Sequence, residues 1–190
     1  MTFWYTARGT YDKSYNEDGM PWDKYLDWSK LQHLTELVSL DAMLNELLVE
    51  PDHDCADDWD FIVIDNKNKF ETGFYTTVDY VFKRKKANEI FNFLTVVVEP
   101  TEDCKNIVLI DFDFMGYELL DQEYGTSALT NCGGFDETFL SSDINNVGLI
   151  DNYDKAFDIK KRLLENNPQE HHADTNVIAV WRHKIIGQHK

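Results

Sequence analysis

Apolar residues recur at helical spacing in the segment between Trp28 and Pro51. Ser29 and Gln32 have the spacing of a capping box, which is typical of a helix N-terminus. We therefore predict a helix from Ser29 to Leu48, with Pro51 just beyond its end. Its apolar face would consist of Leu31, Leu34, Leu37, Val38, Leu40, Leu44, Leu47 and Leu48.

A second helical pattern follows Asp151 and Asn152, either of which is a suitable N-cap. Acidic residues come early in this segment and basic residues come late, which matches the direction of the helix dipole. The string Asn166-Asn167-Pro168 marks the predicted end. The buried face is predicted to hold Tyr153, Ala156, Phe157, Ile159, Leu163 and Leu164.

The segment after the acidic residues near position 55 has the composition of a β-hairpin. Trp59–Ile64 is predicted as a buried strand and Phe70–Phe82 as its partner, with a turn at residues 65–68. Ala87–Leu94 fits either a helix or a strand, whereas Thr95–Val98 is predicted as a strand.

Two more strands are predicted in the second half of the chain. Ile107–Phe114 begins as an apolar run and then alternates, which places Asp111 and Asp113 on one face. Asn176–Ile186 is predicted as the last strand. Two principal helices against about five or six strands, without regular βαβ alternation, indicate an α+β fold with a mainly antiparallel sheet. The length of 190 residues suits one domain over residues 1–190.

The chain is strongly acidic, and this limits the classes of partner. It has 35 Asp and Glu against 18 Lys and Arg, a formal net charge of −17. Residues 87–154 hold fourteen of the carboxylates and a single base, Lys105. Such a field repels nucleic acid phosphate and anionic membrane, and it attracts basic proteins. We therefore expect a basic protein partner and no nucleic acid.

Cysteine content and apolar runs indicate the compartment. Cys55, Cys104 and Cys132 are odd in number and form no CxxC motif, which suits a reducing cytoplasm. No secretion signal is recognisable in the first residues, and no apolar run has the length needed to span a bilayer. A cytoplasmic protein without membrane association is expected.

The densest acidic cluster surrounds a tryptophan, Trp59. A calcium loop starting at Asp52 would need Gly at its sixth position and Glu at its twelfth, but these positions hold Asp57 and Val63. His53 and Cys55 alone do not make a zinc site. We expect neither metal nor cofactor, and two interpretations stay open: a solvated loop, or an acidic recognition surface. The acids concerned are Asp52, Asp54, Asp57 and Asp58.

Cys132 lies in the most enzyme-like string, Asn131-Cys132-Gly133-Gly134-Phe135. If it were a nucleophile, His171 or His172 could serve as the base and Asp174 as the residue that orients it. The order of Cys and His loosely resembles that of the NlpC/P60 cysteine peptidases, although acidic residues follow the cysteine here and would raise its pKa. A small buried thiol in a tight turn is the competing interpretation.

Five acids, Asp111, Asp113, Glu118, Asp121 and Glu123, also invite comparison with the paired carboxylates of glycosidases and nucleases. Carboxylates are abundant throughout this chain, so pairs arise by chance. The shortage of bases that could hold phosphate further opposes a nuclease.

Several strings in the C-terminal part resemble a bacterial family of uncharacterised cytosolic proteins. These are Gly116–Asp121, Ser127–Phe135, Gly148–Ile150, His172–Asp174 and Trp181-Arg182. The resemblance extends from Gly116 onward. It implies a bacterial origin and no particular activity.

The function that these features favour is a protein-binding module, of the immunity type that neutralises a basic protein toxin. The predicted partner-binding residues are Asp52, Asp54, Asp57, Asp58, Trp59, Asp111, Asp113 and Glu123. They would supply electrostatic steering, and Trp59 would anchor the interface if it faces outward. The alternatives are a cysteine hydrolase that uses Cys132 and an acidic accessory protein without enzymatic activity.

Overall fold

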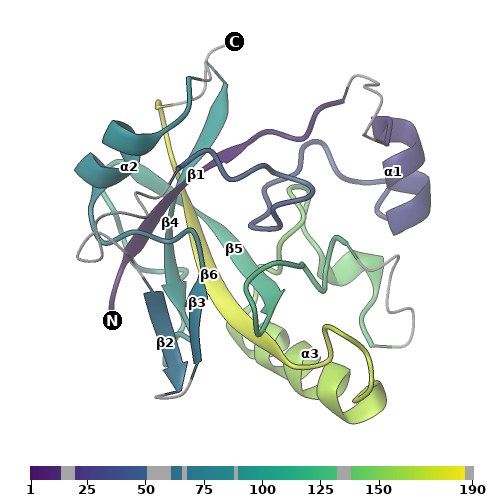
Figure 1. The fold of residues 1–190 in the computed structure, drawn as a ribbon. Helices are drawn as coiled ribbons and strands as arrows, with labels where there is room; N and C mark the ends of the chain where they lie inside the picture. Colours follow the sequence, from purple (N-terminus) through teal and green to yellow (C-terminus); the bar gives the residue numbers. More distant parts are fainter. Residues whose placement is uncertain (14–19, 51–60, 66–67, 88–89, 132–137, 187–190) are drawn as a thin grey trace.

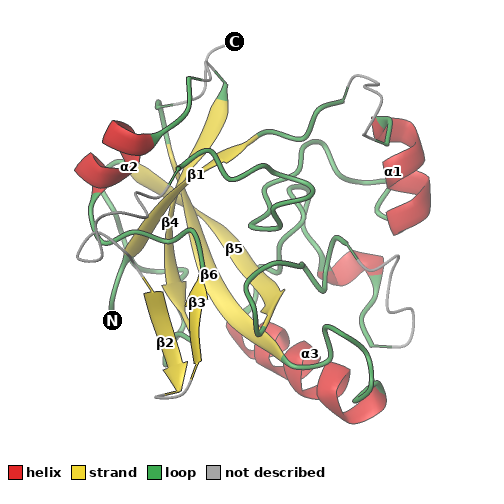
Figure 2. Cartoon of the chain, in the orientation of Figure 1, coloured by secondary structure: helices red, strands yellow, loops and turns green. Residues whose placement is uncertain are grey.

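The computed structural model describes residues 1–13, 20–50, 61–65, 68–87, 90–131 and 138–186, with the backbone alone for 61–65 and 68–71. Within these ranges the chain forms a four-stranded antiparallel sheet, a short hairpin and three α-helices (Figures 1 and 2). The predicted α+β class with an antiparallel sheet is confirmed.

The sheet is built from strands that are far apart in the sequence. Its order is β1 (Trp4–Gly9), β4 (Phe91–Val98), β6 (Thr175–His183) and β5 (Phe112–Asp121). Each strand pairs antiparallel with its neighbour. The inner strands β4 and β6 are buried over almost their whole length, which explains their nearly continuous apolar sequences.

Both outer strands of the sheet bond to segments outside it. Along β1, Tyr5 exchanges two backbone hydrogen bonds of 2.8 Å with Tyr75, and Ala7 O accepts from Leu48 N. Along β5, Tyr117 exchanges backbone hydrogen bonds with Ile150. The central parts of both outer strands are therefore hydrogen-bonded on each side.

The predicted hairpin is confirmed, but its second strand is shorter than expected. β2 (Phe61–Asp65) pairs antiparallel with β3 (Asn68–Glu71), and the strand predicted to continue to Phe82 ends there. Instead, α2 spans Val78–Arg84. The Thr77 hydroxyl caps α2 by accepting the N–H of Tyr80, and this local bond favours a helix start in a segment rich in strand formers.

The long helix predicted from Ser29 to Leu48 is wrong. The first helix, α1, spans Trp22–Ser29 and ends where the prediction began, because Lys30 adopts a left-handed conformation with φ of 59°. No helix is present between residues 31 and 50. The leucine stripe is nevertheless largely buried, so the apolar pattern predicted burial correctly and conformation incorrectly.

Buried polar side chains explain why residues 31–50 are not helical. Asp41 accepts hydrogen bonds from the N–H groups of Met43 and Leu44, and Asn45 accepts one from Ser39 N. The Nδ2 group of Asn45 also donates to Gly9 O at 2.7 Å. Although Asn45 N donates to Asp41 O, an i to i−4 bond, these side-chain bonds engage other backbone groups that a helix would need.

The second predicted helix is confirmed as α3 (Tyr153–Asn166), with Asn152 as its N-cap. Of its predicted buried residues, Ala156, Ile159 and Leu163 are fully buried, whereas Leu164 is 48% exposed. α3 packs on β5 and β6 at one end of the sheet (Figure 1).

The sheet has a distinct covering on each face. On one face, α3 packs with Val177 and Ala179, and α2 places Val81 against Ala7 and Phe93. On the other face, the irregular segment 31–50 contributes Val38 and Leu40, and a second irregular segment contributes Val147 and Leu149. The non-helical segment also contributes Leu31, Leu34 and Leu37 to the cluster that contains Val177, so it supplies buried side chains on both sides of the sheet.

The remaining strand predictions are adjusted at their ends. Residues 107–111 form a turn, so the predicted strand Ile107–Phe114 starts only at Phe112; β4 and β6 confirm Thr95–Val98 and most of Asn176–Ile186. Asp111 therefore lies just before a strand. Within the described ranges, no helix is both long and apolar enough to cross a membrane.

Candidate functional site

The predicted partner-binding residues do not form one group. Asp113 lies at the start of β5 and Asp111 just before it, and Glu123 lies just beyond the end of the strand. The ten residues of β5 separate them by roughly 30 Å, at about 3.3 Å per residue. Asp52, Asp54, Asp57, Asp58 and Trp59 lie outside the described residues, as does Cys132.

The turn at the start of β5, residues 107–111, exposes two branched aliphatic side chains. Val108 and Ile110 are each 88% exposed. Backbone bonds fix the turn: Phe112 N donates to Leu109 O, and Lys184 N donates to Asp111 O at 2.9 Å. We call residues 107–111 the tip loop. Ile185, 73% exposed, follows Lys184 directly and adds a third apolar side chain to this end of the molecule.

A groove of about 390 Å³ adjoins the tip loop. Residues of β1 and β4 and the preceding Phe3 line one part of it, and the tip loop lines the other. The lining residues are Phe3, Tyr5, Thr95, Val108, Leu109, Ile110, Asp111 and Phe112. Because Tyr5 and Thr95 are paired across β1 and β4, they project from the same face of the sheet.

The two aspartates near the start of β5 differ in position and in partners: Asp111 lines the groove, whereas Asp113 is not one of its lining residues. Asp113 lies 3.6 Å from the Nζ of Lys184, which partly neutralises it. No ion pair or hydrogen bond reaches the carboxylate of Asp111 from the part of the chain that the structure describes. The groove thus combines an aromatic and aliphatic lining with one unpaired negative charge.

A second hollow, of about 260 Å³, lies at the other end of β5 and contains Glu123. The carboxylate of Asp121 is nearly buried there, accepts a hydrogen bond from Gly125 N at 2.8 Å and lies 3.5 Å from Nδ1 of His171. Asp174 accepts a hydrogen bond from Nε2 of Gln122 at 3.1 Å. The hollow is acidic, and His171 is its one basic group among the described residues.

The geometry bears on the cysteine hydrolase hypothesis. His171 is paired with Asp121, and the proposed orienting residue Asp174 is instead paired with Gln122. Burial lowers the pKa of His172, and the neighbouring His171 lowers it further. Among the described residues, no three His, Cys, Asp or Glu side chains are grouped so that they could hold a metal ion.

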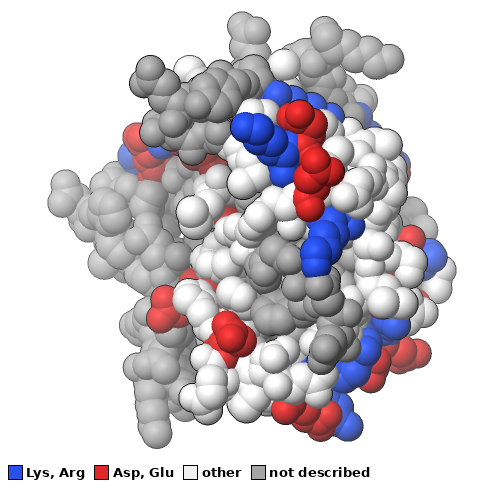
Figure 3. Space-filling model, turned by 90° about the vertical axis from the view of Figure 1, so that its right-hand side faces the viewer, with Lys and Arg blue, Asp and Glu red and all other residues white. Residues whose placement is uncertain are grey.

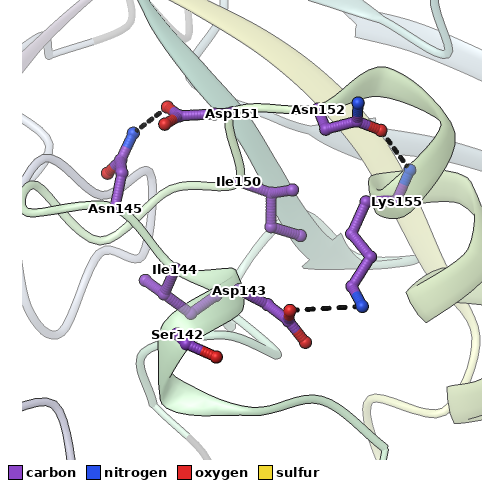
Figure 4. Close-up of a pocket in the computed structure, with 8 residues that line it drawn as sticks. All are labelled: Ser142, Asp143, Ile144, Asn145, Ile150, Asp151, Asn152 and Lys155. Atoms are coloured by element: carbon purple, nitrogen blue, oxygen red, sulfur yellow. Dashed lines mark hydrogen bonds and ion pairs between the residues drawn. The ribbon is translucent and has the colours of Figure 1, made fainter.

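A third hollow was not indicated by the sequence. It measures about 500 Å³ and lies at the N-terminus of α3, lined by Ser142, Asp143, Ile144, Asn145, Ile150, Asp151, Asn152 and Lys155. Figure 4 shows Lys155 reaching to Asp143, with Nζ to Oδ1 at 3.2 Å, and Asn145 donating to Asp151 at 2.7 Å. These polar groups satisfy one another, so little is left to recognise a ligand.

Many basic side chains of the described residues are held in ion pairs. These pairs include Lys86 with Glu46, Lys155 with Asp143, Lys160 with Glu99, Arg162 with Asp158 and Arg182 with Glu36. On the side of the molecule that carries α1, acidic and basic side chains accordingly lie next to one another (Figure 3). These ion pairs neutralise many of the few basic side chains. The net negative charge is therefore carried by the acidic residues outside these pairs.

One carboxylate of the acidic series, Glu118, is buried completely. Ser39 and Ser127 donate hydrogen bonds to it, and burial raises its pKa to about 7. It projects from the opposite face of the sheet to Asp121, since the two are three residues apart on one strand. The paired-carboxylate interpretation therefore does not gather these acids at one site. An acid among Tyr117, Leu119 and Leu120 was the available sequence signal of burial.

Comparison of the chain with protein-family models, curated proteins and solved structures finds no match. The resemblance of the segment from Gly116 onward to a bacterial family stays a prediction.

Proposed function

We propose that the protein is an acidic protein-binding module that binds a basic partner with the tip loop and the adjoining groove. The observation that carries this proposal is the 88% exposure of both Val108 and Ile110 beside the unpaired Asp111. An immunity-type inhibitor of a basic toxin is the specific form that we favour.

The energetic argument starts from the exposed aliphatic side chains. Burying a side chain of this size against a partner contributes about 1.5 to 3 kcal/mol. Two such side chains, with Ile185 close by, supply the apolar centre that interfaces commonly have, and polar groups form the rim. The groove beside them can receive a side chain of the partner.

Charge selects the class of partner. The net charge of −17 accelerates association with a basic surface and slows association with an acidic one. The Asp111 carboxylate can pair with a Lys or Arg of the partner without breaking an ion pair within the described part of the chain. A basic protein therefore fits this surface better than a nucleic acid or an acidic protein.

The test is site-specific photo-crosslinking in a bacterial lysate. A benzoyl-phenylalanine is placed at position 110, or at position 140 as a matched control, because Leu140 is also exposed, at 63%. We expect a basic protein to crosslink at position 110 and not at position 140. The same protein should be lost from pull-downs with the Val108→Ser/Ile110→Ser variant and retained with Leu140→Ser.

Equal crosslinking at both positions, or retention of the partner by the double variant, would contradict binding through the tip loop. The inhibitor form has its own test, which is co-expression with the recovered basic protein. Growth arrest by that protein should be relieved by the wild type and not by the double variant. A recovered partner that causes no arrest would overturn the inhibitor form and leave the binding module intact.

A further inference from the structure

Glu118 is the centre of a buried polar cluster that the proposed binding surface does not use. Its carboxylate is fully shielded from solvent, on a strand whose neighbouring residues are apolar. The cluster joins three separate segments: β5, the irregular segment 39–41 and the segment 127–130. A buried carboxylate that links three segments couples their packing to its own charge.

Both oxygens of Glu118 accept hydrogen bonds. Oε1 accepts from the hydroxyl of Ser127 at 2.8 Å and from Leu119 N at 3.2 Å. Oε2 accepts from the hydroxyl of Ser39 at 3.1 Å and from Leu40 N at 3.4 Å. This donor set satisfies the ionised form.

The same side chains can also satisfy the protonated form. Thr130 Oγ1 lies 2.9 Å from Ser127 Oγ and 3.4 Å from Ser39 Oγ, and either atom of the second pair can be the donor. A proton on Oε2 of Glu118 can therefore be donated to Ser39. Ser39 then donates to Thr130, and Thr130 donates to Ser127. Only the Ser39 hydroxyl changes direction between the two forms, and no buried donor is left unpaired.

Three other titratable groups face this cluster. Asp41, on the 39–41 segment, is fully buried and accepts from Ser127 N at 2.9 Å, and its negative charge disfavours ionisation of Glu118. Arg8 on β1 is buried, and burial lowers its pKa to about 10 while the charges of Asp41 and Glu118 oppose that shift. Tyr25 of α1 donates to Thr130 O, and burial chiefly raises its pKa.

We propose that Glu118, Ser39, Ser127 and Thr130 form a proton-linked latch, which holds segments 39–41 and 127–130 to β5 more tightly when Glu118 is protonated. The exchange involves one proton, taken from or released to solvent, and no other reactant. Below neutral pH the latch is protonated and closed, and above neutral pH it carries a second buried negative charge beside Asp41.

The raised pKa of Glu118 determines how stability changes with pH. Burial raises the pKa of Glu118 from 4.5 to about 7, so between these values the folded protein binds a proton that the unfolded chain does not. The contribution to stability is fully present below pH 4.5 and is lost as the pH rises through about 7. One proton corresponds to a change of up to about tenfold per pH unit in the folding equilibrium constant.

The experiment compares the wild type with Glu118→Gln, whose amide resembles the protonated acid and cannot ionise. Unfolding by urea is measured at intervals from pH 5 to pH 8, with Glu102→Gln as the control because Glu102 is an exposed acid. The folding constant of the wild type, relative to Glu118→Gln, should fall by up to about tenfold per unit until pH 7 and then level off. The folding constant of the wild type relative to Glu102→Gln should not fall in this way, because both proteins retain Glu118.

If the folding constants of the wild type and Glu118→Gln change with pH in the same way, the latch is overturned. If Glu118→Gln does not fold, carbon-13 NMR titration of the wild-type carboxyl replaces it. An inflection near pH 7 supports the latch, and an inflection below pH 5 contradicts it. Hydrogen exchange adds a readout of opening: after correction for intrinsic rates, protection of residues 38–45 and 126–131 should decrease as Glu118 ionises.

Discussion

The two halves of strand β5 show what the same kind of residue does in different surroundings. At its start, Asp113 is exposed beside the tip loop, and the turn places Val108 and Ile110 in solvent. In its second half every residue is buried, including the acid Glu118 and the apolar Leu119. Between the halves, the register of pairing with β6 shifts at residues 114–116.

This contrast shows that the charge counted along the sequence is not the charge presented to a partner. Glu118, Asp41 and Asp121 are all nearly buried and serve hydrogen bonds inside the fold. Asp111 remains available for long-range steering, whereas Asp113 is partly neutralised by Lys184. Apolar residues show the same division. Val108 and Ile110 are exposed and can contact a partner, whereas Leu119 is buried and stabilises the core.

The strongest way to test the contrast is to truncate an aliphatic side chain at each end. Leu119→Ala should lower the free energy of unfolding by about 2 to 5 kcal/mol, because Leu119 is fully buried. Ile110→Ala should change it by no more than about 0.5 kcal/mol. Urea denaturation measures both, and similar losses for the two variants would show that the tip loop belongs to the core.

The junction between the halves should be nearly as sensitive. Gly116 has φ of +134°, and an added Cβ would lie 2.8 Å from Leu149 Cβ and 2.9 Å from Ile150 O. Gly116→Ala should therefore destabilise the protein by at least about 1 to 3 kcal/mol. Gly125→Ala is the matched control, because only Asp121 Oδ2, at 4.0 Å, lies near its added Cβ. Thermal unfolding that shifts equally for both variants would contradict this assignment.

Removing one donor from the buried half should have a moderate effect. Ser39→Ala deletes one hydrogen bond to Glu118 and should cost about 1 to 2 kcal/mol at pH 8, where the carboxylate is ionised. The cost should be smaller at pH 5, because the Ser39 hydroxyl binds the ionised carboxylate more strongly; the latch is tighter at low pH because burial no longer opposes a charge there. A loss that does not depend on pH would indicate a packing role for Ser39 alone.

A substitution at the exposed end of β5 should slow association with the partner and leave the free energy of unfolding almost unchanged. Asp111→Asn should leave the unfolding free energy within about 0.5 kcal/mol of the wild type. Association with the basic partner should slow severalfold at low salt and less at physiological salt, because screening weakens steering. Stopped-flow mixing at several salt concentrations measures this. An unchanged association rate would remove Asp111 from the interface.

The sequence predicted α3, the hairpin, the inner strands and the α+β class, because these elements carry local signals such as caps and apolar runs. It failed between residues 31 and 50, where the leucines have helical spacing. The structure there is decided by Asp41 and Asn45, whose partners include residues as distant as Gly9 and Ser127. Contacts of that range leave no periodic trace in the sequence.

The candidate site was predictable in part for a related reason. The sequence alone indicated Asp111 and Asp113, because acidic residues can be identified without knowing the structure. The apolar anchors were not recognised, since Val108 and Ile110 resemble the core of a strand until the turn at 107–111 is known. The burial of Glu118 had one local signal, its apolar neighbours, but its serine donors come from two remote segments.

The bonds that Tyr5 and Tyr117 make outside the sheet also limit how other chains can associate with it. A free strand edge is a template on which a second chain can add a strand, and this route leads to aggregation. Here Tyr75 and Ile150 already occupy the middle of the two edges. A partner must therefore recognise this sheet through side chains and surface shape, and copies of the protein cannot join edge to edge there without first displacing those segments.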